Sequence, residues 1–181
     1  MKESDSGYIL ANIVEIDDTF FGGPTRGGKR GRGTEKTPVL AAISVNDKGS
    51  PHKVKMKVVK DIKSSTIIDF VNSYIWPGTR ISSDAYHSYR ILKTREDYEY
   101  HYKEYDPQED PGFLKWLHTT ISNAKSFVAG TYHGLDSKHL QAYLDEFCYR
   151  FNRRWRHNHI FNSLLNACIN ADTVTYAELT G

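Results

Sequence analysis

The chain has 181 residues, of which 39% are hydrophobic and 25% are charged, and its formal net charge is +2. A chain of this length is sufficient for one α/β domain with a sizeable core, and its composition is that of an ordinary globular protein. No apolar run approaches the roughly 20 residues that a membrane-spanning helix needs, and the start, MKESDSGY, is not a signal peptide. These features exclude a membrane protein and predict a cytoplasmic one.

Basic residues gather in two segments, although the net charge is close to zero. Residues 25–36 (TRGGKRGRGTEK) are rich in glycine, and residues 150–159 lie in a stretch with helical spacing. The residues expected to contact a polyanion such as DNA are Arg26, Lys29, Arg30, Arg32, Arg150, Arg153 and Arg154. For the second segment the alternative is an arginine face that keeps an amphipathic helix soluble. The glycine-rich segment precedes a strand and opens no helix, so it is not a dinucleotide-binding motif.

Three strands are predicted in the first 60 residues. Residues 13–21 (IVEIDDTFF) are rich in β-branched and aromatic side chains and end at Gly22 and Gly23. Residues 37–45 (TPVLAAISV) form a second strand. Residues 52–60 (HKVKMKVVK) alternate apolar residues with lysines, which indicates a half-exposed strand near a sheet edge. The short connections favour antiparallel pairing of these strands.

The hydrophobic period changes to that of a helix after residue 63. Ser64 or Ser65 is expected to cap a helix whose buried face contains Ile67, Ile68, Val71 and Ile75. Residues 79–83 then form a short strand that leads into Asp84. A strand that follows a helix in this way usually lies parallel to a neighbour in the same sheet.

Two further helices are predicted in the second half of the chain. One covers residues 118–129, and a long one covers residues 137–156, with Ser137 as its expected cap. The intervening pattern at 93–112 does not favour one kind of structure.

Two aspartates occupy unusual places in this pattern. Asp17 lies inside an apolar strand and Asp84 lies where another strand ends. Burying a carboxylate is costly unless a partner offsets the cost, and carboxylates on neighbouring strands are well placed to share Mg²⁺ or Mn²⁺. Two such ions about 4 Å apart activate a water or a 3′-hydroxyl in phosphodiester chemistry. The residues alone leave open a structural carboxylate at Asp17 and a cap or turn aspartate at Asp84.

Four segments of the chain resemble, in order and spacing, the ISXO-like transposases of bacterial insertion sequences, which belong to the DDE superfamily. These segments are VEIDDTFFGG (14–23), SDAYHSY (83–89), ISNAKSFVAGTYHG (121–134) and SKHLQAYLDEFCYRFNRR (137–154). The resemblance extends from about residue 12 to about residue 166. It implies an RNase H-like fold, which is an α/β domain built on a mixed sheet with helices on both faces.

The resemblance also implies a catalytic set. Asp17 and Asp84, 67 residues apart, correspond to its first two members, and Asn123 corresponds to the third, in a branch with Asn there and a downstream lysine. That lysine is either Lys125 or Lys138. Asp17 is preferred to Asp18 because the family's metal ligand directly follows Glu-Ile. His133 and His139, in the matching segments, are interpreted either as ligand or DNA contacts or as structural residues.

The expected organisation is an N-terminal extension at 1–11, a catalytic domain at 12–166 and a C-terminal tail at 167–181. The expected reaction is hydrolysis at an element end followed by strand transfer into target DNA, by a homo-oligomer that holds two Mg²⁺ or Mn²⁺ ions. Family members usually carry a DNA-recognition module ahead of this domain, whereas the match here begins only about 12 residues after the initiator methionine. The alternatives are therefore a nuclease of the same fold that cuts without joining, and an inactive or truncated remnant that only binds DNA.

Overall fold

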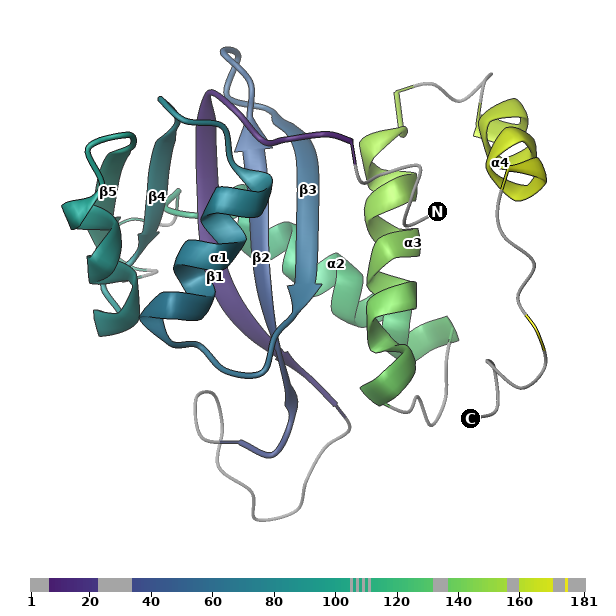
Figure 1. The fold of residues 1–181 in the computed structure, drawn as a ribbon, viewed down its shortest axis with the longest axis horizontal. Helices are drawn as coiled ribbons and strands as arrows, with labels where there is room; N and C mark the ends of the chain where they lie inside the picture. Colours follow the sequence, from purple (N-terminus) through teal and green to yellow (C-terminus); the bar gives the residue numbers. More distant parts are fainter. Residues whose placement is uncertain are drawn as a thin grey trace.

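The protein is built on one five-stranded mixed sheet with helices on both faces (Figure 1). The computed structural model describes residues 7–22, 34–104, 112–131, 137–155 and 160–170, together with Asp106, Gln108, Asp110 and Thr175. The strands are β1 (Ile13–Phe21), β2 (Thr37–Val45), β3 (Pro51–Val58), β4 (Arg80–Asp84) and β5 (Glu99–Lys103). Their order in the sheet is β3-β2-β1-β4-β5, which makes β1 the central strand.

The strand directions divide the sheet into two halves. β1, β2 and β3 form an antiparallel meander, whereas β4 and β5 lie parallel to β1. The predicted bounds of the first two strands are confirmed, and β3 is an edge strand as its alternation with lysines indicated. The predicted parallel pairing of the strand that ends at Asp84 is confirmed as well.

The helical elements are α1 (Ser64–Tyr74), η2 (His87–Thr94), α2 (Lys115–Thr131), η3 (Ser137–His139), α3 (Leu140–Asn152) and α4 (Ile160–Ile169). Helix α1 covers one face of the sheet, while α2 and α3 lie on the other (Figure 1). Among the described residues, no helix combines the length and the hydropathy required to cross a membrane.

The protein has one hydrophobic core on each face of the sheet, and the alternating side chains of β1 contribute to both. Val14 and Ile16 pack with Ile67 and Phe70 of α1, whereas Phe21, on the opposite face, packs with α2 and α3. A fully buried side chain of this size contributes about 1.5–3 kcal/mol relative to an exposed one, so each layer is held mainly by apolar burial. The polar residues of β1 at 15, 17 and 18 interrupt this packing, which makes them the exceptions to explain.

Two predictions of local structure were wrong in detail, and one strand was not predicted. Lys63, not a serine, is the N-cap of α1, and the hydroxyl of Ser64 instead donates to the carbonyl of Ser88 on η2, 3.1 Å away. The long second-half helix begins as a 3-10 turn at Ser137, and His139 is the N-cap of α3. Strand β5 lies in the segment for which no structure was favoured, and most of its residues are exposed.

Candidate active site

The two adjacent aspartates of β1 face opposite sides of the sheet. Asp17 lies on the α2 side, where its Oδ2 is 3.3 Å from Nε2 of His118. Asp18 lies on the α1 side, where its Oδ1 accepts a hydrogen bond from the buried Tyr89 hydroxyl at 3.3 Å. The side chain of Asp17 is 16% exposed, which leaves an oxygen accessible from solvent. Asp18 therefore has a partner in the core, and Asp17 faces a site at the surface.

The register of the parallel pair brings Asp84 to Asp17. Residues 13, 14 and 15 of β1 pair with residues 80, 81 and 82 of β4, an offset of 67. The paired residues end at Glu15 and Ser82, and Asp17 and Asp84 each lie two residues further along their strands, with the same offset and on the same face of the sheet. Neighbouring strands lie about 4.8 Å apart, which is close enough for two carboxylates to share a cation. Asp84 is the last residue of β4, and its Oδ1 accepts the Tyr86 amide at 3.2 Å.

His118 is the residue of α2 that lies next to Asp17, and it is not among the site residues predicted from the sequence. It lies in the first turns of α2, 34 residues after Asp84, and its side chain is 32% exposed. Its ring nitrogen either donates to the Asp17 carboxylate or, when deprotonated, is available as a ligand. The geometry thus adds an imidazole to the two carboxylates.

Glu15 ties the beginning of α2 to the central strand. It lies two residues before Asp17 on the same face, and its Oε2 accepts the backbone N–H of Leu117 at 2.9 Å. The first amides of a helix lack partners within the helix, so this carboxylate satisfies one of them. Burial raises the pKa of Glu15, whereas the Leu117 hydrogen bond and the nearby His118 act in the opposite direction. Glu15 therefore fixes the position of the residue that directly precedes His118.

Lys125 is the lysine that lies near Asp17. It follows His118 by seven residues, about 20° around the helix axis, so both side chains lie on one side of α2. Its Nζ is 5.9 Å from the centre of the Phe21 ring. Desolvation and the charge of Lys36 lower the pKa of Lys125, and the Asp17 carboxylate raises it. Lys138 lies in η3, before α3, and α3 packs against β3, two strands away from β1.

Asn123 lies on the opposite side of α2 from His118. The expectation that it belongs to a helix packed on the sheet is confirmed. Five residues separate it from His118, which corresponds to about 140° around the helix axis, and its side chain is exposed. Its assignment as the third catalytic residue stays a prediction, and the helix geometry favours His118 in that place.

The arginines at the end of α3 make contacts within the chain, and Arg154 joins α3 to β3. Arg154 donates to the carbonyls of Phe151 and His52 at 2.8 and 3.0 Å, and Arg153 donates to that of Tyr149 at 3.4 Å. Arg150 pairs with Glu146 at 2.7 Å and remains 66% exposed. Their predicted DNA contacts remain predictions. Arg26, Lys29, Arg30, Arg32 and His133 lie outside the described residues.

The donor atoms fit a hard divalent cation in part. Asp17 and Asp84 offer carboxylate oxygens, the ligands that Mg²⁺ and Mn²⁺ prefer, and His118 offers a nitrogen. Within the part of the chain that the structure describes, no group of three or more His, Cys, Asp or Glu side chains is placed so that it could hold a metal ion. Asp17, Asp84 and His118 therefore supply a partial set of donor atoms, and water or phosphate oxygens would have to complete it.

Comparison with solved structures supports the fold. The catalytic core domain of BIV integrase, a retroviral integrase with an RNase H-like fold, matches with a TM-score of 0.52 at 15% sequence identity. The match covers 80% of this chain and 85% of that one. At this identity the likeness shows the fold alone, and the predicted RNase H-like mixed sheet is confirmed. A search of curated proteins found no significant match.

The family model for the ISXO2-like transposase domain matches residues 9–152. This range contains the whole sheet, both aspartates and helices α1, α2 and α3. The resemblance noted from the four sequence segments is therefore confirmed, and the chain belongs to the ISXO2-like transposase family.

Proposed function

We propose that the chain cuts DNA at the ends of an insertion sequence and joins the freed ends to target DNA. The observation that carries this proposal is the shared offset of 67, which supports a position for Asp84 near Asp17, on the face where His118 lies 3.3 Å from Asp17. The family match and the integrase-like fold support a DDE transposase-type function.

Each side chain has a role that its position supports. Asp17 and Asp84 hold one or two Mg²⁺ or Mn²⁺ ions, which supply Lewis acidity and lower the pKa of a bound nucleophile. His118 completes this donor set from α2. Lys125, whose ammonium lies near the end of β1, binds a non-bridging oxygen of the scissile phosphate as a point charge.

The chemistry consists of two in-line displacements at phosphorus. In the first, water attacks the phosphodiester, and the bond to the 3′ oxygen breaks to release a 3′-hydroxyl. In the second, that hydroxyl attacks a phosphodiester of the target, and the target's own 3′ oxygen leaves. Both steps need the same carboxylates, so one site performs them in turn. The proposed partners are the element's terminal inverted repeats and target DNA, bound by a homo-oligomer in the bacterial cytoplasm.

Two other functions would use the same fold. A nuclease would perform the first displacement and not the second. A DNA-binding remnant would perform neither. A strand-transfer assay with pre-cleaved ends separates the transposase from the nuclease, because joined products form only when the second displacement takes place.

Asp17→Asn and Asp18→Asn form a matched pair for testing the proposal. The two substitutions remove the same charge from adjacent residues that face opposite sides of the sheet. We expect Asp17→Asn to abolish Mn²⁺-dependent nicking of a supercoiled plasmid and Asp18→Asn to retain it. Circular dichroism of both variants reports whether the fold is intact. Equal activity of the two folded variants would refute the assignment.

A further inference from the structure

A pocket of about 480 Å³ opens on the α1 side of the sheet, at the end where β1 and β4 stop. Four segments line it: the end of β1, the segment that leads into β2, the connection from β3 to α1, and the residues after β4. Its volume falls within the range of about 300–1,000 Å³ that is usual for small-molecule sites. Asp17 and His118 lie on the opposite face of β1, so this pocket is distinct from the carboxylate site.

The lining of the pocket carries an excess of positive charge. It contains Lys36, Lys60 and Lys63, and among the described residues that line it Asp61 is the one carboxylate. Asp61 already accepts the Thr66 hydroxyl at 2.6 Å and pairs with Lys63 at 3.5 Å. Lys36 and Lys60 thus supply positive charge that Asp61 does not balance, and this charge favours an anionic ligand.

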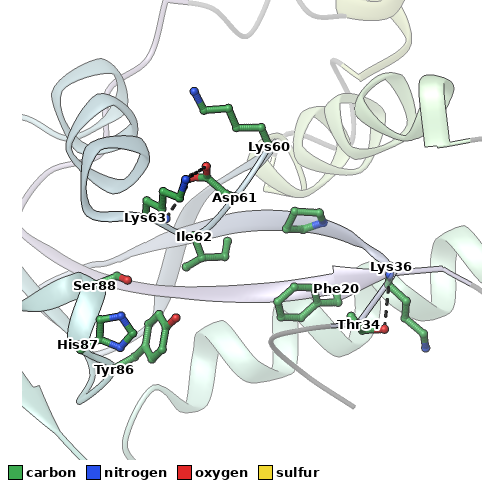
Figure 2. A pocket seen from close by; sticks show the side chains of 11 residues that line it. Phe20, Thr34, Lys36, Lys60, Asp61, Ile62, Lys63, Tyr86, His87 and Ser88 are labelled. Carbon is green, nitrogen blue, oxygen red and sulfur yellow. Dashed lines mark hydrogen bonds and ion pairs between the residues drawn. The ribbon is translucent and has the colours of Figure 1, made fainter. Parts of the chain in front are cut away.

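The remaining lining consists mainly of aromatic rings and apolar side chains. Figure 2 shows Phe20 and Ile62 in the middle of the pocket, Tyr86 and His87 at one end, and Lys36 at the other. The rings of Tyr86 and His87 have centroids 4.2 Å apart. Aromatic faces beside lysines are the combination by which proteins hold single-stranded nucleic acid, because rings stack on bases and ammonium groups bind phosphates.

Two contacts connect the pocket to the carboxylate site. The backbone amide of Tyr86 donates to Oδ1 of Asp84 at 3.2 Å, so the backbone that carries the Tyr86 ring is joined to a proposed metal ligand. The stem of Lys36 lies against Gly22, where an added Cβ would come within 3.2 Å of its Cγ. The charge of Lys36 also lowers the pKa of Lys125, which shows that it lies within electrostatic reach of the active face.

We propose that this pocket holds one unpaired nucleotide of the DNA next to the phosphate that is cut, with its base against Phe20 and Tyr86 and the phosphates on either side of that base at Lys36 and Lys60. A base within a duplex has both faces covered by its neighbours, and only an extruded or single-stranded base presents a face to these rings. The proposal rests on the proposed function for the identity of the DNA strand, and its test is a binding measurement that needs no catalysis.

The test compares two fluorescent probes by anisotropy in the presence of EDTA: a short blunt duplex, and the same duplex with a single-stranded thymidine extension. We expect the wild-type chain to bind the extended probe more tightly. Tyr86→Ala should reduce this preference about tenfold, as expected for the loss of one stacked base. Tyr86→Phe keeps the ring and should keep the preference.

Two controls separate the pocket from general effects. Tyr102→Ala removes an exposed aromatic side chain from β5 and should leave the preference unchanged. Lys60 is exposed, so Lys60→Ala tests the pocket even if Tyr86→Ala fails to fold. We expect Lys60→Ala to weaken binding of the extended probe several-fold more than Lys48→Ala, which removes an exposed lysine from the turn between β2 and β3.

Thymidine monophosphate should displace the extended probe at lower concentration than inorganic phosphate. Equal displacement would mean that the pocket reads charge alone and would overturn the proposal. The proposal would also be overturned if the wild-type chain showed no preference for the extension, or if folded Tyr86→Ala retained it. A preference for the extension without metal-dependent nicking would contradict the proposed function and leave the pocket assignment standing. Metal-dependent nicking without a preference for the extension would support the proposed function and overturn the pocket assignment.

Discussion

Replacing Glu15 with alanine tests whether this carboxylate anchors α2. The substitution removes the acceptor of the Leu117 N–H at the beginning of the helix. Leaving a partly buried donor unsatisfied costs about 1–3 kcal/mol. Equilibrium unfolding in urea should therefore show a loss of about 2 kcal/mol. Glu96→Ala, at an exposed position, should change the free energy of unfolding by less than about 0.5 kcal/mol.

The same substitution should affect catalysis by more than the loss of folded protein. His118 directly follows Leu117, so a looser first turn of α2 displaces the imidazole from Asp17. Misplacing a catalytic group by about 1 Å costs as much as 100-fold in rate, so nicking by the folded variant should fall at least several-fold. A variant that is as stable as Glu96→Ala would refute the anchoring role, as would one that is destabilised yet fully active when folded.

Three further predictions concern the site and its surroundings. Lys125→Ala should lower nicking at least tenfold if the ammonium binds a transition-state phosphate, whereas Asn123→Ala should leave the rate within about twofold. The reverse order would support the sequence-based assignment of Asn123 as the third catalytic residue. An imidazole in the donor set favours Mn²⁺ over Mg²⁺, so the wild-type chain should work better with Mn²⁺, and His118→Glu should shift this preference toward Mg²⁺ in parallel rate measurements. The Arg95 guanidinium forms hydrogen bonds to both Asp97 oxygens at 2.9 and 2.7 Å and lowers the pKa of Asp97 below its usual 3.8. The extra stability of wild type over Asp97→Asn should therefore be present at neutral pH and lost as the pH falls through the lowered folded-state pKa. A stability difference that does not depend on pH would contradict this prediction.

The sequence predicted the strands of the meander and the place of Asp17 well, because apolar and β-branched residues mark the strands and glycine marks the end of β1. The place of Asp84 was also predictable, since a strand that returns after a helix lies parallel to a neighbour. The equality between the spacing of the two aspartates and the strand register becomes visible only when the register is known.

The parts that were missed have physical reasons. Strand β5 is exposed along most of its length, so it lacks the apolar alternation that identifies a strand, and its pairing with β4 defines it. His118 lies at the beginning of a helix, and a single histidine there forms no sequence motif that indicates a functional site. One signal was present in the sequence: His118 precedes Lys125 by seven residues, two helical turns, so the two share a side of the helix. Asn123 does not satisfy this spacing.

The central claim is that Asp17 and Asp84 form one metal site, and calorimetric titration with Mn²⁺ tests it most directly. The wild-type chain and Asp18→Asn should both bind Mn²⁺, because Asp18 faces Tyr89 on the other side of the sheet. Asp17→Asn and Asp84→Asn should each weaken binding at least tenfold, because each removes one of two shared carboxylates. Unchanged Mn²⁺ binding in these two variants, or loss of binding in Asp18→Asn alone, would contradict the account.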